Sequence, residues 1–269
     1  MKAASPLARN EGALLDVRAL ALRAGPRVLL RDLTLRVERG QFWAVVGRNG
    51  AGKTTLLAAL AGIAAPESGQ IDLLGKPIAQ WKPADAATVR GFLPQHVEPL
   101  FGVSVLQAAL LGRHPHQGRR FAQMWESAED VSIAIDALEQ VDLQGLRSRD
   151  VATLSGGERQ RAAIASLLAQ DPMLYLLDEP LSHLDLHHQH AAMQLLRRRA
   201  SDGGRAVVAS VHDLSMAARF ATHALVFTGA TACVSGPAQE VLDEATLSAA
   251  FGHRVRRLVD GETVALVAG

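Results

Sequence analysis

The order of apolar and polar positions predicts strands at the start of the chain. From Leu14 to Val37, apolar and polar residues alternate, as in L-D-V-R-A-L-A-L, and this two-residue period is typical of antiparallel strands with one buried face. The next run, F-W-A-V-V from Phe42 to Val46, is apolar throughout, which indicates a buried parallel strand. A glycine loop and an apolar helix, from Lys53 to about Ala61, are predicted to follow.

The middle of the chain has a different pattern. Between about Val103 and Val151, apolar residues recur every three or four positions, as in W-E-S-A-E-D-V-S-I-A-I-D-A-L-E-Q-V, and this spacing predicts helices. Strand-like runs return at Met173 to Leu177 and at Ala206 to Val211, with helical segments between them. From about Leu225 onward we expect short strands and a final helix.

These alternating elements predict an α/β fold with a mostly parallel core sheet and helices on its faces. We expect a loose tail at residues 1–12 and a single domain over residues 13–269. That domain would combine the core sheet with an antiparallel β subdomain and a helical subdomain at about residues 103–160. A chain of 269 residues is long enough to bury such a core.

Composition narrows the class of protein. The formal net charge is +1 and aromatic residues make up 4% of the chain, which disfavours a dedicated nucleic-acid binder, since such proteins need a basic surface or stacking platforms. The single cysteine, Cys233, fits a reducing compartment. The first residues lack the apolar core of a signal peptide, and no run approaches about 18 apolar residues, so we expect a cytoplasmic protein.

The segment G-R-N-G-A-G-K-T, Gly47 to Thr54, has the spacing of a phosphate-binding loop. It lies between the predicted buried strand and the predicted helix, so its N–H groups and the helix dipole would face a phosphate. Its glycines permit a tight turn and a close backbone approach. Lys53 adds positive charge toward the β and γ oxygens, and the Thr54 hydroxyl is suited to Mg²⁺.

Two carboxylates end the predicted strand L-Y-L-L, where open parallel sheets bind their ligands. Asp178 suits Mg²⁺, and Glu179 suits a general base that polarises an attacking water. His212, just beyond the strand V-A-S-V, can hydrogen-bond a γ-phosphate. Gln95, in F-L-P-Q-H, can contact the metal or the water through its side-chain oxygen.

A second segment, L-S-G-G-E-R-Q-R from Leu154 to Arg161, has the features of a helix entrance that holds an anion. In their order along the chain, these segments closely resemble the nucleotide-binding subunit of an ABC transporter, over about Leu14 to Gly252. In that family's terms they are the Walker A loop (G-R-N-G-A-G-K-T-T), the Q-loop glutamine (Gln95), the signature (L-S-G-G-E-R-Q), the Walker B strand (L-Y-L-L-D-E-P), the D-loop (Ser182 to Asp185) and the switch histidine (His212).

The resemblance implies the P-loop fold of an ABC-type ATPase and a set of site residues. Catalysis would fall to Glu179, His212 and Gln95. Mg²⁺ would be held by Thr54, Gln95 and Asp178. The residues implied to bind ATP are Gly47, Asn49, Gly50, Ala51, Gly52, Lys53, Thr54, Thr55, Ser155, Gly156, Gly157 and Asp185.

The resemblance also implies partners. Ser155 and Gly157 would close on the ATP of a second copy, so we expect a head-to-tail homodimer. Hydrolysis would drive transport through two transmembrane permease subunits, with a substrate-binding protein involved indirectly and no nucleic acid. The subunit would then lie peripherally on the inner face of the cell membrane.

Two stretches resemble one group within the family. S-V-L-Q-A-A-L-L-G-R-H-P-H, from Ser104 to His116, together with D-E-P-L-S-H-L-D-L-H-H-Q, looks like the ATPases of iron-chelate, haem and cobalamin importers, and the tail Gly236 to Leu242 fits that group too. Within it we favour a ferric siderophore or cobalamin as cargo.

Two features depart from a simple match. The family usually places an aromatic residue before the first turn, where it stacks on adenine, but the stretch Arg23 to Arg27 has none; an arginine can stack there through its guanidinium plane. The histidine-rich segment His183 to His190 lacks acids or cysteines at ligand spacing. We therefore expect a solvated face or a partner contact there, and likewise at His114 and His116, in preference to a metal site.

Two other classes remain as alternatives. A soluble ABC ATPase acting on DNA or ribosomes usually carries two cassettes or a long coiled coil, and this chain has one cassette and no sustained heptads. In a P-loop nucleotide kinase or GTPase, the signature and the switch histidine would have no role. An apolar groove around Phe101 to Leu111 that docks a short helix of a membrane partner would favour transport, whereas a basic stripe would favour nucleic acid.

Overall fold

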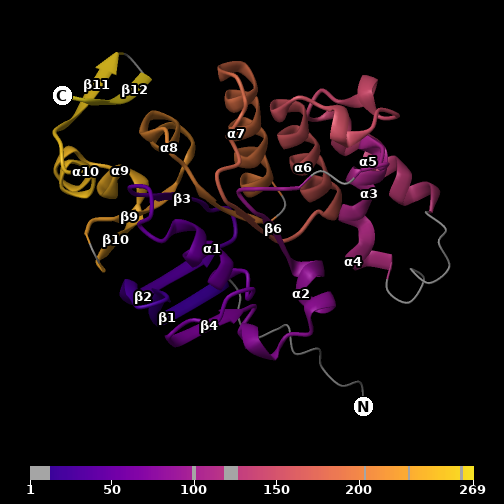
Figure 1. Ribbon diagram of the computed structural model, residues 1–269. Coiled ribbons are helices and arrows are strands. Elements are labelled where there is room, and N and C mark those ends of the chain that lie inside the picture. Colours follow the sequence, from indigo (N-terminus) through magenta and orange to yellow (C-terminus); the bar gives the residue numbers. More distant parts are fainter. Residues whose placement is uncertain (1–12, 99–100, 118–126, 203, 230, 261–262) are drawn as a thin grey trace.

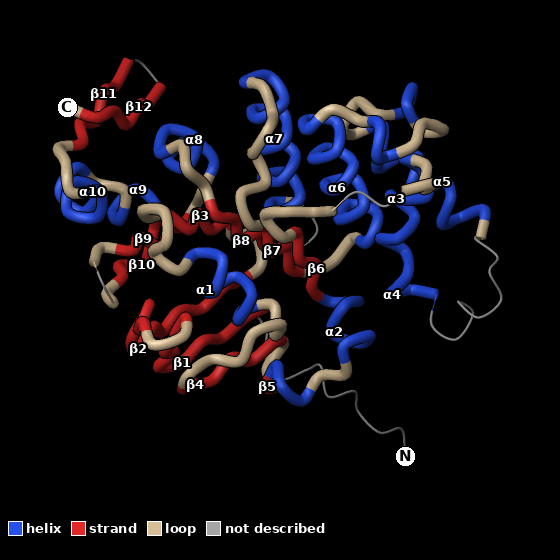
Figure 2. The backbone as a smooth tube through the Cα atoms, viewed as in Figure 1, coloured by secondary structure: helices blue, strands red, loops and turns tan. Residues whose placement is uncertain are grey.

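Figure 1 shows the computed structural model, which describes residues 13–98, 101–117, 127–202, 204–229, 231–260 and 263–269. The predicted tail, residues 1–12, lies outside the described residues. A six-stranded sheet crosses the middle of the molecule, with helices above one face and a four-stranded antiparallel sheet below the other (Figure 2).

The six-stranded sheet is parallel except at one edge. Its strands, in spatial order, are β10 (Cys233–Pro237), β9 (His223–Phe227), β3 (Phe42–Val46), β8 (Ala206–Ser210), β7 (Leu174–Leu177) and β6 (Arg90–Leu93). Only β10 pairs antiparallel, with β9. The strands predicted at Phe42 to Val46, Met173 to Leu177 and Ala206 to Val211 are confirmed.

Each central strand supplies two cores, because its side chains alternate between the two faces. In β3, Phe42, Ala44 and Val46 join the core beneath the helices, whereas Trp43 and Val45 join the core shared with the antiparallel sheet. All five residues of β3 are buried. A strand covered on both faces needs apolar residues at every position, which explains its unbroken apolar run.

The antiparallel sheet lies below the central one, and a single helix packs against both sheets. Its strands, in spatial order, are β2 (Arg27–Glu38), β1 (Ala13–Ala24), β4 (Ser68–Leu73) and β5 (Lys76–Pro77). Helix α1 (Lys53–Leu60) lies between the two sheets and buries Leu56, Leu57 and Leu60 in the shared core (Figure 2). The predicted antiparallel strands and the helix from Lys53 are confirmed.

Helices cover the other face of the central sheet and extend beyond β6 (Figure 1). Those packed on the sheet are α6 (Gly156–Gln170), α7 (Leu186–Ser201) and α8 (Leu214–Phe220). The segments between β5 and α6 are η2 (Ile78–Gln80), α2 (Pro83–Val89), α3 (Val105–Leu110), η3 (Leu111–Arg113), α4 (His114–Gln117), α5 (Ala128–Glu139), η5 (Gln144–Leu146) and η6 (Val151–Thr153). The region from Val103 to Val151 is helical as predicted, while the subdomain boundary at about residues 103–160 stays a prediction. No helix among the described residues has the length and apolar character needed to cross a membrane.

The end of the chain differs from the prediction of a final helix. Helices α9 (Ala238–Val241) and α10 (Glu244–Phe251) are followed by a hairpin of β11 (Val255–Asp260) and β12 (Thr263–Ala268). The physical reason is visible in the sequence, since valines favour strands and Asp260-Gly261 between two apolar runs is a hairpin signal.

The contact between η3 and α6 yields a stability test. A Cβ on Gly112 would stand 1.9 Å from the backbone carbonyl oxygen of Ser166, so one of the two backbones must shift to admit it. We expect Gly112→Ala to lower the free energy of unfolding by about 3 kcal/mol, the upper end of overpacking costs. Urea denaturation of the full chain measures this.

The matched control is Gly145→Ala, because nothing lies within 4 Å of a Cβ at that position. We expect that variant to differ from wild type by less than about 0.5 kcal/mol. Equal stability of Gly112→Ala and wild type would contradict the close approach of η3 to α6.

Candidate functional site

The loop after β3 surrounds the side chain of Lys53, the first residue of α1. Lys53 is buried, and its ammonium donates to the carbonyl oxygens of Gly47 at 2.9 Å and Arg48 at 3.3 Å. Burial lowers the pKa of this ammonium, whereas the nearby carboxylates of Glu179 and Asp178 act to raise it. The loop therefore holds a positive charge at the N-terminus of α1, where unpaired N–H groups also favour an anion.

Two glycines of this loop are required by space and backbone geometry. Gly52 has a φ of 111°, and a Cβ there would stand 3.1 Å from the Cβ of Leu29. A Cβ on Gly47 would stand 2.9 Å from the Cβ of Phe227. These contacts press the loop against β2 and β9, so its shape is set before any ligand enters.

Ser210, at the end of β8, forms hydrogen bonds with the two acidic residues that follow β7. Asp178 and Ser210 are fully buried, and the Ser210 hydroxyl donates to Asp178 Oδ1 at 2.7 Å. The same hydroxyl oxygen accepts from the backbone N–H of Glu179 at 2.7 Å. Ser210 was not among the residues predicted from the sequence, although it stands two residues before His212 in V-A-S-V-H.

The Glu179 carboxylate lies between the other two residues predicted for catalysis. Gln95 Nε2 donates to Glu179 Oε2 at 2.9 Å, and His212 Nε2 lies 2.6 Å from Glu179 Oε1. Glu179 has a φ of 51°, a left-handed conformation that side-chain-bearing residues adopt mainly where the surroundings enforce it. Gln95, Glu179 and His212 therefore form one group, in which a hydrogen bond reaches one carboxylate oxygen of Glu179 and the His212 ring nitrogen contacts the other.

One cavity of about 570 Å³ brings the loop and this group together. Its lining residues are Ala24, Arg27, Leu29, Asn49, Gly50, Gly52, Lys53, Thr54, Thr55, Gln95, Glu179 and His212. Gly47 and Ala51, also predicted to bind ATP, are not part of this lining. Ala24, Arg27 and Leu29 come from the turn between β1 and β2 and the start of β2, the stretch at which the sequence lacked the expected aromatic residue.

The oxygen groups beside this cavity fit a magnesium ion. Asp178 Oδ2 is buried and has no hydrogen-bond partner within the described part of the chain. Thr54 is exposed at the cavity, and Gln95 engages Glu179 through its nitrogen, which leaves its oxygen for a cation. Carboxylate, hydroxyl and amide oxygens are the hard ligands that Mg²⁺ takes, together with water and phosphate.

Ser155 forms the N-cap of α6. Its hydroxyl oxygen accepts from the Glu158 N–H at 3.2 Å, and the Glu158 carboxylate accepts from the Ser155 N–H at 2.7 Å, which is a capping box. The backbone hydrogen bond from Ser155 is the main cause that lowers the pKa of Glu158. The cap uses the hydroxyl of Ser155 as an acceptor only, so its hydrogen stays available to donate to an anion.

Ser155 and its neighbours line a second cavity, of about 450 Å³. Among its lining residues are four of those predicted to bind ATP, namely Ser155, Gly156, Gly157 and Asp185. None of the residues that line it also lines the first cavity. The predicted ATP contacts of one chain therefore fall on two separate surfaces.

The histidine-rich segment makes contacts within and beside α7. Asp185 is the N-cap of α7 and accepts from the His188 N–H at 2.9 Å, and this bond is the main cause that lowers the Asp185 pKa. His188 Nδ1 lies 2.9 Å from the Asp185 carboxylate. The His190 ring packs edge-on against Phe220, with 5.2 Å between ring centroids.

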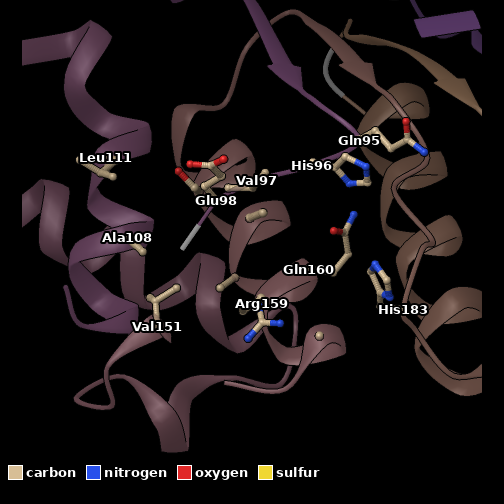
Figure 3. A pocket seen from close by; sticks show the side chains of 14 residues that line it. Gln95, His96, Val97, Glu98, Ala108, Leu111, Val151, Arg159, Gln160 and His183 are labelled. Atoms are coloured by element: carbon tan, nitrogen blue, oxygen red, sulfur yellow. The ribbon is translucent and has the colours of Figure 1, made fainter. Parts of the chain in front are cut away.

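A groove of about 480 Å³ opens between the segment after β6 and the helices α3 and α6 (Figure 3). Ala108, Leu111 and Val151 lie on one side of it, and Gln95 and His183 lie on the other (Figure 3). Leu111 is 52% exposed, and Phe101, in the same segment of the chain, is 85% exposed. The exposed side chain of Leu111 thus lines the groove, while Gln95 belongs both to the groove and to the first cavity.

Comparison with known proteins gives a consistent result. The profile of the ABC transporter family matches residues 30–182. The hemin import ATP-binding protein HmuV of Myxococcus xanthus is 41% identical over 249 residues, which cover 90% of this chain and 91% of that protein. The achromobactin transport ATP-binding protein CbrD of Dickeya dadantii is 36% identical and covers 90% of this chain and 89% of that protein. A solved metal-chelate type ABC transporter in an inward-facing conformation is 29% identical, with a TM-score of 0.81 over 96% of this chain and 98% of that chain.

The double role of Ser210 yields a test. Ser210→Ala leaves Asp178 Oδ1 and the Glu179 N–H buried without their shared partner, so we expect the free energy of unfolding to fall by about 1–3 kcal/mol. Ser201→Ala is the control, because Ser201 is exposed at the end of α7 and should change stability by less than about 0.5 kcal/mol. Urea denaturation that gave equal midpoints for the two variants would contradict this role.

Proposed function

The chain belongs to the ABC transporter family, as an ATP-binding subunit whose ATPase activity is coupled to transport, and we propose that it energises the import of a metal chelate. The observation that carries this proposal is the convergence of Lys53, Glu179 and His212 on one cavity at the carboxyl ends of the parallel strands. Such a cavity combines a phosphate cradle with a base that can act on water.

We assign the roles in hydrolysis as follows. The N–H groups of the phosphate loop and Lys53 bind the β and γ phosphates. Glu179 acts as the general base toward the attacking water, and His212 hydrogen-bonds the γ-phosphate. Thr54, Asp178 and Gln95 would hold Mg²⁺, which neutralises phosphate charge when bound.

The contacts of Glu179 indicate how nucleotide binding prepares the base. In the structure, Gln95 contacts one of its carboxylate oxygens and His212 contacts the other. A bound γ-phosphate would be an alternative anionic partner for His212. The attacking water would be an alternative hydrogen-bond partner for Gln95. Glu179 Oε1 would then be free to accept a proton from that water.

We propose that ATP is bound between two copies of the chain. The first cavity holds no residue of the signature turn, and the second contains Ser155 with an available hydroxyl hydrogen and the N-terminus of a fifteen-residue helix. A head-to-tail homodimer brings the second cavity of each copy onto the γ-phosphate held in the first cavity of the other. ATP then joins the two subunits, and hydrolysis separates them.

Two transmembrane permease subunits are the proposed partners at the groove of Figure 3. Its apolar wall and the exposed side chains of Leu111 and Phe101 suit a short helix of each permease subunit. Because Gln95 lines both the groove and the ATP cavity, a helix seated there would sense the state of the nucleotide. This arrangement keeps the subunit on the inner face of the membrane, with a substrate-binding protein acting on the far side.

The cargo would be recognised by the permease and substrate-binding subunits and not by this chain. Its identity is therefore proposed from the related proteins. The relatives named for hemin import and achromobactin transport support a metal chelate, with hemin as the first candidate. The alternative of a soluble ABC ATPase on nucleic acid or ribosomes has no comparable support, because the chain is nearly neutral and the relatives it resembles are transport subunits.

The central test of this proposal is Glu179→Gln. We expect the variant to bind ATP and to accumulate as an ATP-bound dimer. We expect its rate of hydrolysis to be lower than that of wild type by a factor of about 100 or more. Steady-state hydrolysis and size-exclusion chromatography with ATP measure both effects. Lys53→Ala is the control that should lose ATP binding and the dimer together. Hydrolysis by Glu179→Gln at the wild-type rate would contradict the assignment of the base.

A second test concerns the permease. Leu111→Glu places a charge on the apolar wall of the groove, so we expect it to abolish co-purification with the permease subunits while ATP binding is retained. Ile63→Glu is the matched control, because Ile63 is 62% exposed and lies outside the groove. Loss of the permease from both variants, or from neither, would argue against this docking surface.

A further inference from the structure

The hairpin of β11 and β12 at the end of the chain forms a sheet of its own, beside α8 and α10 (Figure 1). Its side chains Val255 and Leu266 are 1% and 7% exposed, and they join the core beneath the helices together with Met216 and Phe220 of α8. A two-stranded hairpin alone is at best marginally stable in water. This one is therefore held in place by the helices that it contacts.

Hydrogen bonds from its two outer edges fix the hairpin to a helix on either side. At the edge formed by β11, the Val255 N–H donates to Ser248 Oγ of α10 at 2.9 Å. At the edge formed by β12, the Leu266 N–H donates to Ser215 Oγ of α8 at 3.0 Å. Backbone donors that a two-stranded sheet leaves unpaired are thus used to connect the end of the chain to two helices.

The bond to Ser215 reaches the segment that contains His212. Ser215 lies in the first turn of α8, three residues after His212, and its N–H donates at 2.8 Å to Oδ1 of Asp213, the N-cap of that helix. On the other side of His212, the Val211 N–H donates to the Val45 carbonyl oxygen of β3 at 3.1 Å. The backbone of His212 is therefore held between the end of the central sheet and the first turn of α8.

These two supports matter because the ring of His212 has little packing of its own. Its side chain is 47% exposed, and its Nε2 lies 2.6 Å from Glu179 Oε1. The direction in which the ring points depends on the backbone on either side. One support is a six-stranded sheet, but the other is a helix of seven residues, which is too short to be stable without tertiary contacts.

We propose that the hairpin of β11 and β12 clamps the first turn of α8 and so fixes the imidazole of His212, with Ser215 as the positioning residue. This inference rests on the proposed role of His212 in hydrolysis. Loss of the Ser215 hydroxyl leaves the Leu266 N–H without its acceptor and releases the first turn of α8 from the end of the chain. His212 would then meet the γ-phosphate less accurately, while the phosphate loop and Lys53 would still bind ATP.

The experiment is single-turnover hydrolysis of ATP by the full chain in excess over nucleotide, with ATP affinity and urea denaturation measured for the same variants. We expect Ser215→Ala to lower the rate of hydrolysis about three- to tenfold, which is less than the hundredfold that a misplacement of about 1 Å can cost. Its affinity for ATP should be unchanged. Ser215→Thr keeps the hydroxyl and should restore the wild-type rate.

Ser248→Ala is the matched control, because it removes the same kind of hydrogen bond at the other edge of the hairpin. It should lower the urea midpoint about as much as Ser215→Ala and keep the rate of hydrolysis within about twofold of wild type. His212→Ala should lower the rate about a hundredfold. Adding Ser215→Ala to it should change that rate by less than about twofold, because Ser215 acts through His212.

Each contrary result has a distinct meaning. A wild-type rate in Ser215→Ala would overturn the clamp, and equal losses of rate in Ser215→Ala and Ser248→Ala would reduce it to a general loosening of the fold. A further severalfold loss when Ser215→Ala is added to His212→Ala would show that the effect does not pass through the imidazole. If the wild-type chain hydrolyses no ATP, or if His212→Ala hydrolyses it at the wild-type rate, the proposed function or the role of His212 fails, and this inference fails with it.

Discussion

The hydrogen bonds of Ser210 connect the ends of two parallel strands, and the arrangement of the site depends on them. The hydroxyl of Ser210 in β8 bonds Asp178 Oδ1 and the Glu179 backbone, both just beyond β7. The register of β3, β8 and β7, with Val45 opposite Ser210 and Leu177 opposite Ala209, brings the three chain exits to one edge of the sheet. The phosphate loop, the carboxylates and His212 leave from that edge, where parallel sheets bind their ligands. A shift of one residue in this register would point these groups into the two cores.

The second cavity is tied to the first by rigid contacts within the chain. Gln160 of α6 donates from Nε2 to the Pro180 carbonyl oxygen at 3.0 Å, next to Glu179. A Cβ on Gly157 would stand 2.9 Å from the His183 carbonyl oxygen, so the signature turn rests directly on the segment that follows Glu179. In the proposed dimer, these contacts would couple the position of α6 to that of Glu179 in the same chain. Gln95 and residues of α6 also line the groove that we propose for the permease, so a helix seated there would contact the same connected unit.

Much of the fold and of the candidate site could be predicted from the sequence, because the strongest sequence signals are local. The apolar run Phe42 to Val46 and the glycine loop after it are defined by neighbouring residues, and both predictions agree with the structure. Ser210 was missed because a buried serine in a strand gives no local signal; its role exists only once β7 and β8 are paired. The prediction of a final helix was wrong because β-branched valines near the end favour strands, and these strands form the hairpin of β11 and β12.

We propose that each ATP is held by the phosphate loop of one copy and the signature turn of another. Mixing two inactive variants, Lys53→Ala and Ser155→Arg, tests it directly. A dimer with one copy of each gathers both defects in one site and leaves the other site intact. We expect that neither variant alone hydrolyses ATP and that the mixture does. A mixture as inactive as its components would contradict the claim and would place the whole site within a single chain.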